Sequence, residues 1–230
     1  MMATADLNVE PIEANFSLKD RIYTTLRKAI TSMNIYAEDA ELRLDERELS
    51  EKLAISRTPI REALARLEQE GLVRIVPRKG VFIVRKTKGE ILEMITVWAA
   101  LESMAARLIT EAASDAEIAS LRRLFATFEG EEVGAQIDEY SERNIDFHTR
   151  ILQLSKCGLL NETANNLFIH MRSIRARTIS EHDRAKRSII DHIHIIEVLE
   201  ARDAELAERL VREHTLNLAA HVDANVDYLD

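Results

Sequence analysis

Residues 49–83 constrain the fold more than any other part of the chain, and they read LSEKLAISRTPIREALARLEQEGLVRIVPRKGVFI. Just before them, Asp45 and Glu48 stand three residues apart, which predicts a helix start resembling a capping box with Asp in the usual place of Ser or Thr. A second helix is predicted to begin around Pro59, because the first turn of a helix makes no internal use of its N–H groups. Gly71 is expected to end this second helix.

The second helix has an apolar face and a basic face. The apolar residues recur at helical spacing and are expected to face a core: Ile60, Ala63, Leu64 and Leu67. Arg57, Thr58 and Arg61 remain on the opposite face, near the helix start. A helix of this kind fits the DNA major groove, where arginine can bind guanine O6 and N7 together. An ordinary helical hairpin with solvated arginines is the alternative.

A β-hairpin is predicted directly after this helix. Val73 and Ile75 alternate with other residues on one side of a turn, and Val81 and Ile83 do so on the other. The turn at residues 77–80 contains two cations and a glycine, which suits contact with phosphates or with a minor groove. Together, the two helices and the basic hairpin favour a DNA-binding winged helix-turn-helix.

The net charge of −9 is unusual for a DNA-binding protein, but the charge is unevenly distributed. Residues 47–86 contain 10 Lys and Arg against 5 Asp and Glu, whereas residues 87–230 contain 16 against 26. The cations are therefore concentrated in the elements that are predicted to face DNA.

Composition limits the class of protein. A chain of 230 residues with 46% hydrophobic residues can bury a core, and its six glycines and three prolines indicate a mainly helical fold. The single cysteine, Cys157, excludes an internal disulfide framework and fits a reducing cytosol. The first residues do not resemble a signal peptide, and the apolar run at 94–101 is too short to span a membrane. We therefore expect a soluble, cytoplasmic protein.

Three segments are expected: a mobile arm at residues 1–16, the winged helix-turn-helix domain at 17–86, and an all-helical domain at 87–230. The last segment shows no second β pattern, no glycine-rich phosphate loop and no Cys-x-x-Cys pair. It is predicted to be an antiparallel six-helix bundle with a ligand cavity. The six predicted helices lie at about residues 89–112, 115–129, 134–155, 159–178, 182–202 and 204–228.

Three histidines lie on predicted inward faces of different helices. His148 follows Asn144 by four residues, so the two side chains share one face. His192 and His214 each lie on an apolar stripe of their own helix. Three neutral imidazoles could converge on one divalent metal, because imidazole is the commonest ligand for such ions. Separate core histidines, each with its own hydrogen bond, are the alternative.

The segment ERELSEKLAISRTPIREALARLEQEGLV, followed by PRKGVFI, resembles the winged helix-turn-helix of the GntR superfamily of bacterial transcription regulators. The resemblance extends over residues 18–84. The chain departs from the family at residues 34–40, which replace the Gly and Pro-Gly often found between the first two helices, and this affects the expected turn. The resemblance implies DNA contacts before the second helix, at the start of the recognition helix and at the wing tip: Arg47, Ser56, Arg57, Thr58, Arg61, Arg78, Lys79 and Gly80.

The segments NIDFHTRI and DHIHIIEVLEARDAELAERLVREH resemble the FCD domain, the C-terminal ligand-binding domain of the FadR subfamily. Many members bind a divalent metal there, and the resemblance implies the ligands Asn144, His148, His192 and His214. Where this chain has Asn144 the family usually has a carboxylate, and an amide oxygen can coordinate but adds no negative charge. Zinc is the first choice of metal, with nickel, manganese or iron as alternatives. The predicted helix count resembles the six-helix, VanR-like branch.

The same resemblance implies a small organic acid as the effector. Arg172 and Arg175 could pair with its carboxylate or form surface salt bridges, and Asn217 is a further candidate for the pocket. Trp98 stands where the family tends to have an arginine. It either fills the core or lines the cavity and stacks on a planar or aromatic ligand.

These features predict a homodimeric, ligand-responsive repressor without a membrane partner. It is expected to bind palindromic operator DNA, because a single recognition helix reads only a half-site. A sensor in which the metal ion itself is the effector is the first alternative. A metal-dependent hydrolase is the second, but it lacks a general base, because Asp146 and Asp191 are expected to point away from the histidine face.

Overall fold

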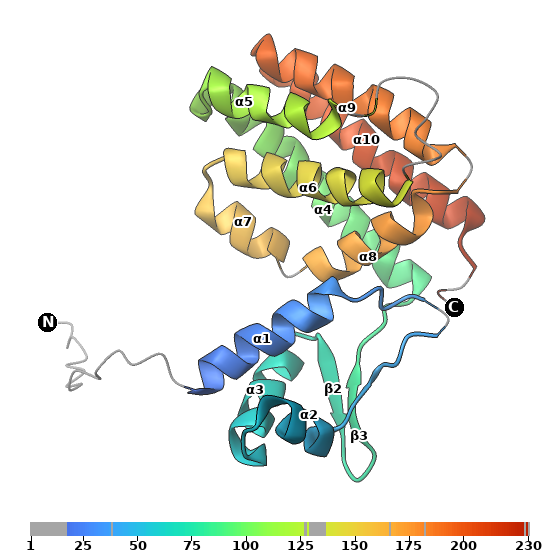
Figure 1. Ribbon diagram of the computed structural model, residues 1–230. Coiled ribbons are helices and arrows are strands. Elements are labelled where there is room, and N and C mark those ends of the chain that lie inside the picture. The colour runs from blue at the N-terminus through green and yellow to red at the C-terminus, as the bar shows by residue number, and fades with distance from the viewer. Residues whose placement is uncertain are drawn as a thin grey trace, which may run out of the picture. The chain divides into compact units, whose positions relative to one another are not determined.

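The computed structural model describes residues 18–37, 39–126, 128, 137–165, 167–181, 183–227 and 229 (Figure 1). The predicted arm at residues 1–16 and Ser17, the expected cap of the first helix, lie outside the described residues. The chain forms two compact units, and each is described by itself. The N-terminal unit contains residues up to Ala29 together with Arg43–Phe82, and the C-terminal unit contains Ile30–Leu42 together with the chain from Ile83.

The N-terminal unit is a winged helix-turn-helix, and the chain as a whole is mainly helical, as predicted. Its sheet has three strands in the order β1-β3-β2, in which Arg43 of β1 lies opposite Phe82 of β3. The sequence predicted only two of these strands, because β1 has two residues and is too short to show an alternating pattern. The elements are α1 (Leu18–Ser32), β1 (Arg43–Leu44), α2 (Glu46–Leu53), α3 (Arg57–Gln69), β2 (Val73–Val76) and β3 (Gly80–Ile83).

Local signals set the ends of the two helices of the motif. Asp45 caps α2, because its Oδ1 accepts the backbone N–H of Arg47 at 2.8 Å and that of Glu48 at 3.1 Å. The carboxylate of Glu48 does not complete a capping box and instead pairs with Lys52 at 2.6 Å. After α3 the chain turns at Gly71 with a φ of 73°, a left-handed conformation that favours glycine.

The burial of the apolar residues in the wing follows their alternation in the sequence only in part. Val73, Val81 and Ile83 are buried, whereas Ile75 is 36% exposed. The backbone N–H of Ile75 donates to the side chain of Glu68 at 2.6 Å. The predicted hairpin is present, but Ile75 does not share the burial of the other three apolar residues.

The C-terminal unit contains seven α-helices among the described residues, so the prediction of six is wrong. The predicted helix at 159–178 is two helices, because the chain turns between them with a bond from the N–H of Leu167 to the carbonyl of Ala164 at 3.0 Å. No Gly or Pro marks this break, and the helix count no longer argues for a six-helix branch. The elements are α4 (Lys88–Ala112), α5 (Asp115–Arg122), the short 3-10 helix η1 (Arg123–Phe125), α6 (Ile137–Leu154), α7 (Gly158–Asn165), α8 (Phe168–Thr178), α9 (Arg184–Glu200) and α10 (Ala204–Asn225).

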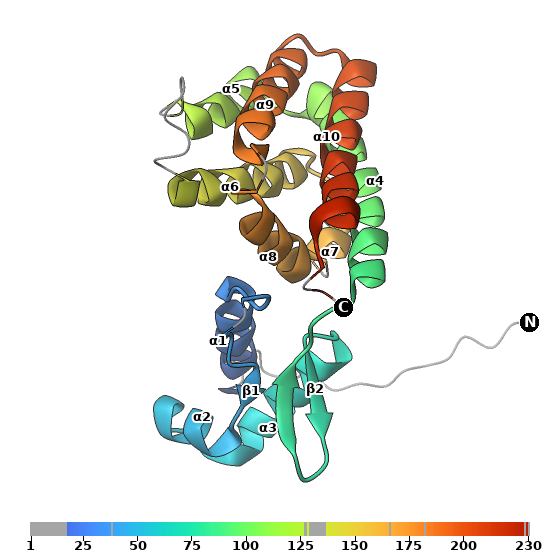
Figure 2. The same ribbon diagram turned by 90° about the vertical axis from the view of Figure 1, so that its right-hand side faces the viewer.

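The long helices α4 and α10 run side by side along one edge of this bundle (Figure 2). Thr87 starts α4 with a complete capping box, in which its hydroxyl accepts the N–H of Glu90 and the Glu90 carboxylate accepts the N–H of Thr87. The inner face of α4 buries Ile91, Ile95 and Trp98. Among the helices that the structure describes, none is both long enough and apolar enough to cross a membrane.

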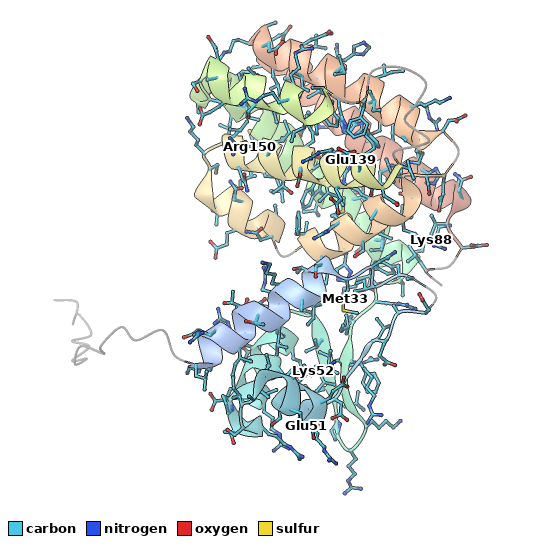
Figure 3. The ribbon with its side chains drawn as sticks, in the orientation of Figure 1. Met33, Glu51, Lys52, Lys88, Glu139 and Arg150 are labelled. Atoms are coloured by element: carbon cyan, nitrogen blue, oxygen red, sulfur yellow. The ribbon has the colours of Figure 1, made fainter. Side chains whose placement is uncertain are left out.

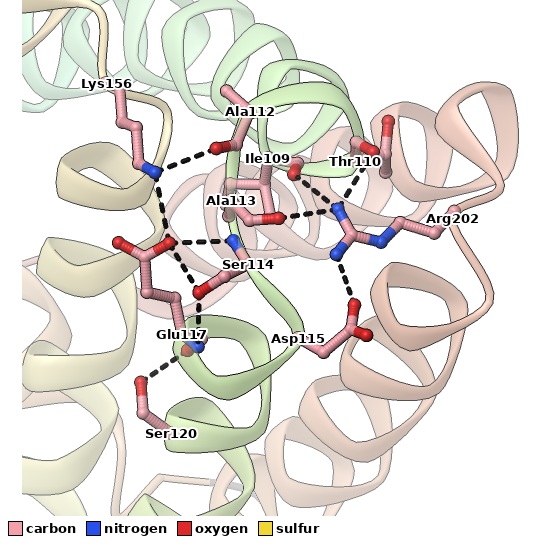
Figure 4. Close-up of polar contacts among 10 residues, drawn as sticks. All are labelled: Ile109, Thr110, Ala112, Ala113, Ser114, Asp115, Glu117, Ser120, Lys156 and Arg202. Atoms are coloured by element: carbon pink, nitrogen blue, oxygen red, sulfur yellow. Dashed lines mark hydrogen bonds and ion pairs between the residues drawn. The ribbon is translucent and has the colours of Figure 1, made fainter.

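Two cations hold the far end of α4 against the segments that follow it (Figure 4). Arg202 donates to the carbonyls of Thr110 at 3.1 Å and Ala113 at 2.7 Å, and Lys156 donates to that of Ala112 at 2.8 Å. These carbonyls lack partners inside the helix and carry the negative end of its dipole. Both cations thus fix the helix end that supports the rest of the bundle.

The segment 30–42, which contains the end of α1 and the chain up to β1, is held by polar contacts inside the C-terminal unit. The hydroxyl of Tyr36 is 2.8 Å from Nδ1 of the buried His170, and Arg85 donates to the carbonyl of Ile35 at 2.6 Å. Ser173 of α8 donates to the carbonyl of Met33 at 3.4 Å. Through His170 and Ser173, this segment therefore contacts residues that follow the predicted boundary at 86.

Candidate nucleic-acid interface and candidate metal centre

The predicted recognition residues lie exposed at the first turn of α3. Ser56, Arg57, Thr58 and Arg61 are all exposed. Arg61 donates from Nε to Oε2 of Glu46 at 2.6 Å. Within the described residues, Arg57 has no hydrogen bond or ion pair, so its guanidinium is available to an outside partner.

Arg47, which is predicted to contact DNA ahead of α3, pairs with Glu51 at 2.9 Å. Glu51 lies on α2 (Figure 3). Both side chains are more than half exposed, so this pair is weak and easily exchanged for another partner.

The wing tip presents two further cations. Arg78 and Lys79 are exposed, and neither has an ion pair in the part of the chain that the structure describes. The turn is closed by the N–H of Lys79 on the carbonyl of Val76 at 3.0 Å. Gly80 has a φ of 120°, a backbone conformation that residues with a Cβ rarely adopt. Glycine is therefore required for the turn that carries these cations.

Three of the four predicted metal ligands come together in the C-terminal unit. His148 of α6, His192 of α9 and His214 of α10 are buried, and one nitrogen of each lies within 4.8 Å of the others. Asn144 lies one turn before His148 on α6 and is 1% exposed. In the described structure its Oδ1 is buried without a hydrogen-bond partner. A buried polar atom without a partner is costly, so this oxygen can accept a cation or a donor.

Arg175 of α8 sets the tautomer of His148. Its Nη1 lies 2.6 Å from His148 Nε2, and a guanidinium can only donate, so Nε2 carries the lone pair and Nδ1 the proton. Nδ1–H then donates to Oε1 of Glu102. Burial, followed by the charge of Arg175, lowers the pKa of His148 well below its usual value. This histidine is therefore neutral, which is the form that binds metals.

A second chain of contacts orients the other two histidines. Nδ1 of His214 lies 2.9 Å from Oδ2 of Asp191, and His192 Nε2 lies 3.1 Å from His214 Nε2. If Asp191 accepts the Nδ1 proton, the lone pair of His214 Nε2 points into the cluster and accepts Nε2–H of His192. His192 Nδ1 then accepts the hydroxyl of Tyr140 at 3.4 Å. The expectation that Asp191 points away from the histidines is thus wrong, because Asp191 contacts His214 from the outer side.

Glu102 is a central residue that the sequence did not single out for a role. It is fully buried, and it accepts Nε1–H of Trp98 at 3.0 Å and the hydroxyl of Thr215 at 2.7 Å besides the proton of His148. Burial raises the pKa of Glu102, and the guanidinium of Arg175 opposes this. One signal was present, namely a single glutamate on the otherwise Ala-rich, inward face of its helix.

The predicted effector residues have different surroundings. Trp98 is 1% exposed and packs near Phe168, with 6.4 Å between ring centroids, as core filling would require. Arg172 donates to the carbonyl of Thr31 at 3.4 Å, so only Arg175 of the two predicted arginines contacts the histidine cluster.

Asn217 lines a cavity of about 350 Å³ between α9 and α10. Asp191 and His214 line the same cavity, together with Arg184 and Arg187. Burial lowers the pKa of Arg184 to about 10, so it remains cationic at neutral pH. The cavity thus joins the outer side of the histidine cluster to two cations.

Comparisons with known proteins agree with both units. Residues 18–83 match the family described as bacterial regulatory proteins, gntR family, and residues 93–217 match the FCD domain. The Nta operon transcriptional regulator of Aminobacter aminovorans is 34% identical over 188 residues, which cover 81% of this chain and 84% of that protein. This chain belongs to the GntR family and carries an FCD domain.

Further relatives support the same assignment. The HTH-type transcriptional repressor RspR of Escherichia coli is 23% identical over 205 residues, or 89% of each chain. Among solved structures, E. coli McbR/YncC shares the fold with a TM-score of 0.73 at 22% identity, covering 92% of this chain and 99% of that one. This GntR-family protein is accordingly a transcriptional regulator rather than an enzyme, with a DNA-binding unit and an effector-binding FCD domain. The hydrolase alternative has no support among these relatives.

Proposed function

We propose that this regulator is a repressor whose affinity for a palindromic operator changes when a small organic acid binds at a metal ion in the FCD domain. The observation that carries the proposal is the convergence of the nitrogens of His148, His192 and His214 within 4.8 Å. Next to this cluster, the cavity lined by Arg184 and Arg187 suits a negatively charged ligand.

The donor set fits a divalent transition metal. Three imidazole nitrogens and one amide oxygen suit zinc first, and also nickel, manganese or iron. The unpartnered Oδ1 of Asn144 gains a partner when it coordinates. Glu102 and Asp191 fix the orientations of His148 and His214, as carboxylates commonly do for metal-bound imidazoles. When bound, the metal supplies a Lewis-acidic position for a carboxylate oxygen of the effector.

DNA binding is assigned to the exposed residues of the N-terminal unit. Arg57 and Thr58 read base edges from the first turn of α3, while Arg78 and Lys79 bind phosphates or a minor groove from the wing tip. Arg61 and Arg47 exchange their partners Glu46 and Glu51 for DNA. The hydroxyl group of Ser56 and the backbone of Gly80 provide the remaining proposed DNA contacts.

A two-fold dimer is part of the proposal, and the outer face of α4 suits it. Glu93, Val97, Ala100, Met104 and Arg107 recur at alternating steps of four and three residues, as in the seam of two paired helices. Val97 and Met104 are 48% and 44% exposed, and α4 lies at the edge of the bundle (Figure 2). An antiparallel α4 from a second copy, crossing at Ala100, places Val97 against Met104 and Glu93 against Arg107, which makes the stripe self-complementary.

Light scattering after gel filtration tests this dimer. Replacing Val97 and Met104 together by Glu is expected to halve the mass of the particle, because two carboxylates then lie in an apolar seam. Leu159→Glu is the control, since Leu159 is 74% exposed on α7, outside the stripe. If both variants still had twice the mass of a single chain, α4 would be ruled out as the interface.

The regulatory function is tested with DNA duplexes that the full-length protein selects from a random-sequence pool. Fluorescence anisotropy then measures affinity for them in chelator, in Zn²⁺, and in Zn²⁺ with a panel of aliphatic and aromatic carboxylates. We expect an acid to weaken binding only when Zn²⁺ is present. A change with Zn²⁺ alone would favour the metal-sensor alternative, and the selection of no duplex would refute the proposal.

A further inference from the structure

Arg175 occupies the position at His148 that a metal ion needs. The side chain of Arg175 is 4% exposed, and its Nη1 donates to His148 Nε2 at 2.6 Å. That nitrogen has a single lone pair, which is directed at the guanidinium. Arg175 and a divalent cation are therefore mutually exclusive partners of His148, and their like charges also repel each other.

The guanidinium is itself incompletely satisfied. Within the described residues, Nε and Nη2 of Arg175 are buried and have no hydrogen-bond partner. The nearest carboxylate oxygen, Oε2 of Glu102, lies 3.6 Å from Nη2, close enough for charge pairing but too far for a good hydrogen bond. Glu102 Oε2 already accepts from Trp98 and Thr215. Nε–H and Nη2–H lie on the same edge of the planar guanidinium, so the two donors match the two oxygens of a carboxylate.

His192 is also in a state that opposes metal binding. With the proton of His214 on Nδ1, facing Asp191, His192 must donate Nε2–H into the cluster. To present a lone pair there, His192 has to move its proton to Nδ1, where the oxygen of Tyr140 can accept it. A metal must therefore displace existing hydrogen bonds at both His148 and His192.

We propose that Arg175 makes metal binding and anion binding in this FCD domain depend on each other. Without an anion, Arg175 stays on His148 and keeps the affinity for metal low. A carboxylate pairs with the two unsatisfied donors of Arg175, draws the guanidinium away from His148 and frees Nε2. Because coupling between two ligands is reciprocal, the metal raises the affinity for the anion by the same factor. This inference rests on the proposed metal site and adds the residue that couples its two ligands.

The test measures Zn²⁺ affinity of the full-length protein by competition with a chromophoric chelator, in a non-coordinating buffer. The probes are acetate, benzoate and malonate, and benzamide serves as an uncharged counterpart of benzoate. For the unaltered protein we expect at least one carboxylate to strengthen Zn²⁺ binding about tenfold, a typical size for such coupling, and benzamide to have no effect. A carboxylate-independent affinity would overturn the coupling.

Arg175→Gln is expected to bind Zn²⁺ at least about tenfold more tightly without any anion, and to lose the carboxylate dependence. Arg172→Gln is the matched control on the same helix, because Arg172 donates to the carbonyl of Thr31 and not to the histidine cluster, and it should behave like the unaltered protein. If Arg175→Gln does not fold, the pair Glu102→Gln with Arg175→Met removes both buried charges and gives the same readout. Equal affinity with and without Arg175 would refute the inference.

The outcomes separate the inference from the proposed function. If neither the unaltered protein nor Arg175→Gln binds Zn²⁺, the metal site itself is refuted. If both bind it equally and His214→Ala abolishes binding, the metal site stands and only the coupling role of Arg175 is refuted.

Discussion

The two units of this regulator place their functional groups in opposite environments. The candidate DNA contacts come from residues 47–80, and all but Gly80 are exposed. They include cations such as Arg57 that have no partner among the described residues. The histidine cluster is buried and is assembled from α6, α9 and α10, with Glu102 of α4 and Arg175 of α8 around it. Exposed charges can remain unpaired because water solvates them, whereas a buried polar group that loses its partner destabilises the fold. Single substitutions should therefore change DNA affinity in the N-terminal unit and the free energy of unfolding in the C-terminal unit.

The largest expected effect is on the buried pair of Glu102 and Arg175. Glu102→Ala leaves the Arg175 charge buried without its counter-ion, and it should lower the free energy of unfolding by about 3–5 kcal/mol. Urea unfolding measures this loss. Glu51→Ala removes the exposed pair with Arg47 and should cost no more than about 0.5 kcal/mol. Similar losses of unfolding free energy in the two variants would contradict the difference between the buried and the exposed unit.

The next effect is on DNA affinity. Arg57→Ala should weaken binding to selected duplexes by about 1–3 kcal/mol, the usual range for an arginine that reads a base. Arg61→Ala should cost less, because in the free protein Arg61 already has a partner in Glu46 that it must release. Anisotropy titrations at fixed salt give both values, and unfolding curves should match those of the unaltered protein. If neither variant lost DNA affinity, α3 would not be the recognition helix.

A smaller effect, on Zn²⁺ affinity, is expected for the residues of the C-terminal unit that orient the histidines. Asp191→Asn weakens the contact to His214 Nδ1 and should lower Zn²⁺ affinity about tenfold. Asp146→Asn is a matched control on α6, since Asp146 is exposed and pairs only with Arg143 at 3.6 Å in the described structure. Chelator competition compares the two, and equal affinities would show that Asp191 does not support the site.

The smallest effect concerns pH and His170. Burial, followed by the charge of Lys86, lowers the pKa of His170 to about 4, while an unfolded histidine titrates near about 6.5. Below the unfolded pKa only the unfolded state takes up the proton, so stability falls as the pH drops from about 6.5 toward 4, and it is unaffected above this window. The loss approaches about 1.4 kcal/mol per pH unit.

His170→Gln keeps a partner for the hydroxyl of Tyr36 but cannot take up the proton. It should therefore lessen the loss of stability by about 1 kcal/mol at pH 5.5, as measured by urea unfolding at pH 7.5 and 5.5. An unchanged difference between the two pH values would show that His170 does not carry this sensitivity.

Most of the N-terminal unit could be predicted because its signals are local. Asp45, Pro59 and Gly71 act on backbone groups within a few residues of themselves, so the sequence alone locates α2 and α3. The third strand was missed, because a two-residue strand depends on pairing with β3 and has no pattern of its own.

The C-terminal unit was predicted at the level of helices, with one error. The break between α7 and α8 has no Gly or Pro, so only the packing of the two helices reveals it. Helical spacing placed His148, His192 and His214 on inward faces, but spacing alone favoured separate core histidines, and only the family resemblance pointed to a shared metal. Whether the three meet depends on how α6, α9 and α10 pack.

The sequence by itself determined the fold class, the second helix of the motif with its exposed cations, and the wing, because short-range backbone chemistry and the alternation of apolar residues specify them. Only the tertiary structure decided that Glu102 and Asp191 orient the histidines, that Trp98 is buried, and that Arg175 rather than Arg172 contacts the cluster. These roles depend on side chains from helices far apart in the chain. Their burial and mutual hydrogen bonds arise only when the helices pack together.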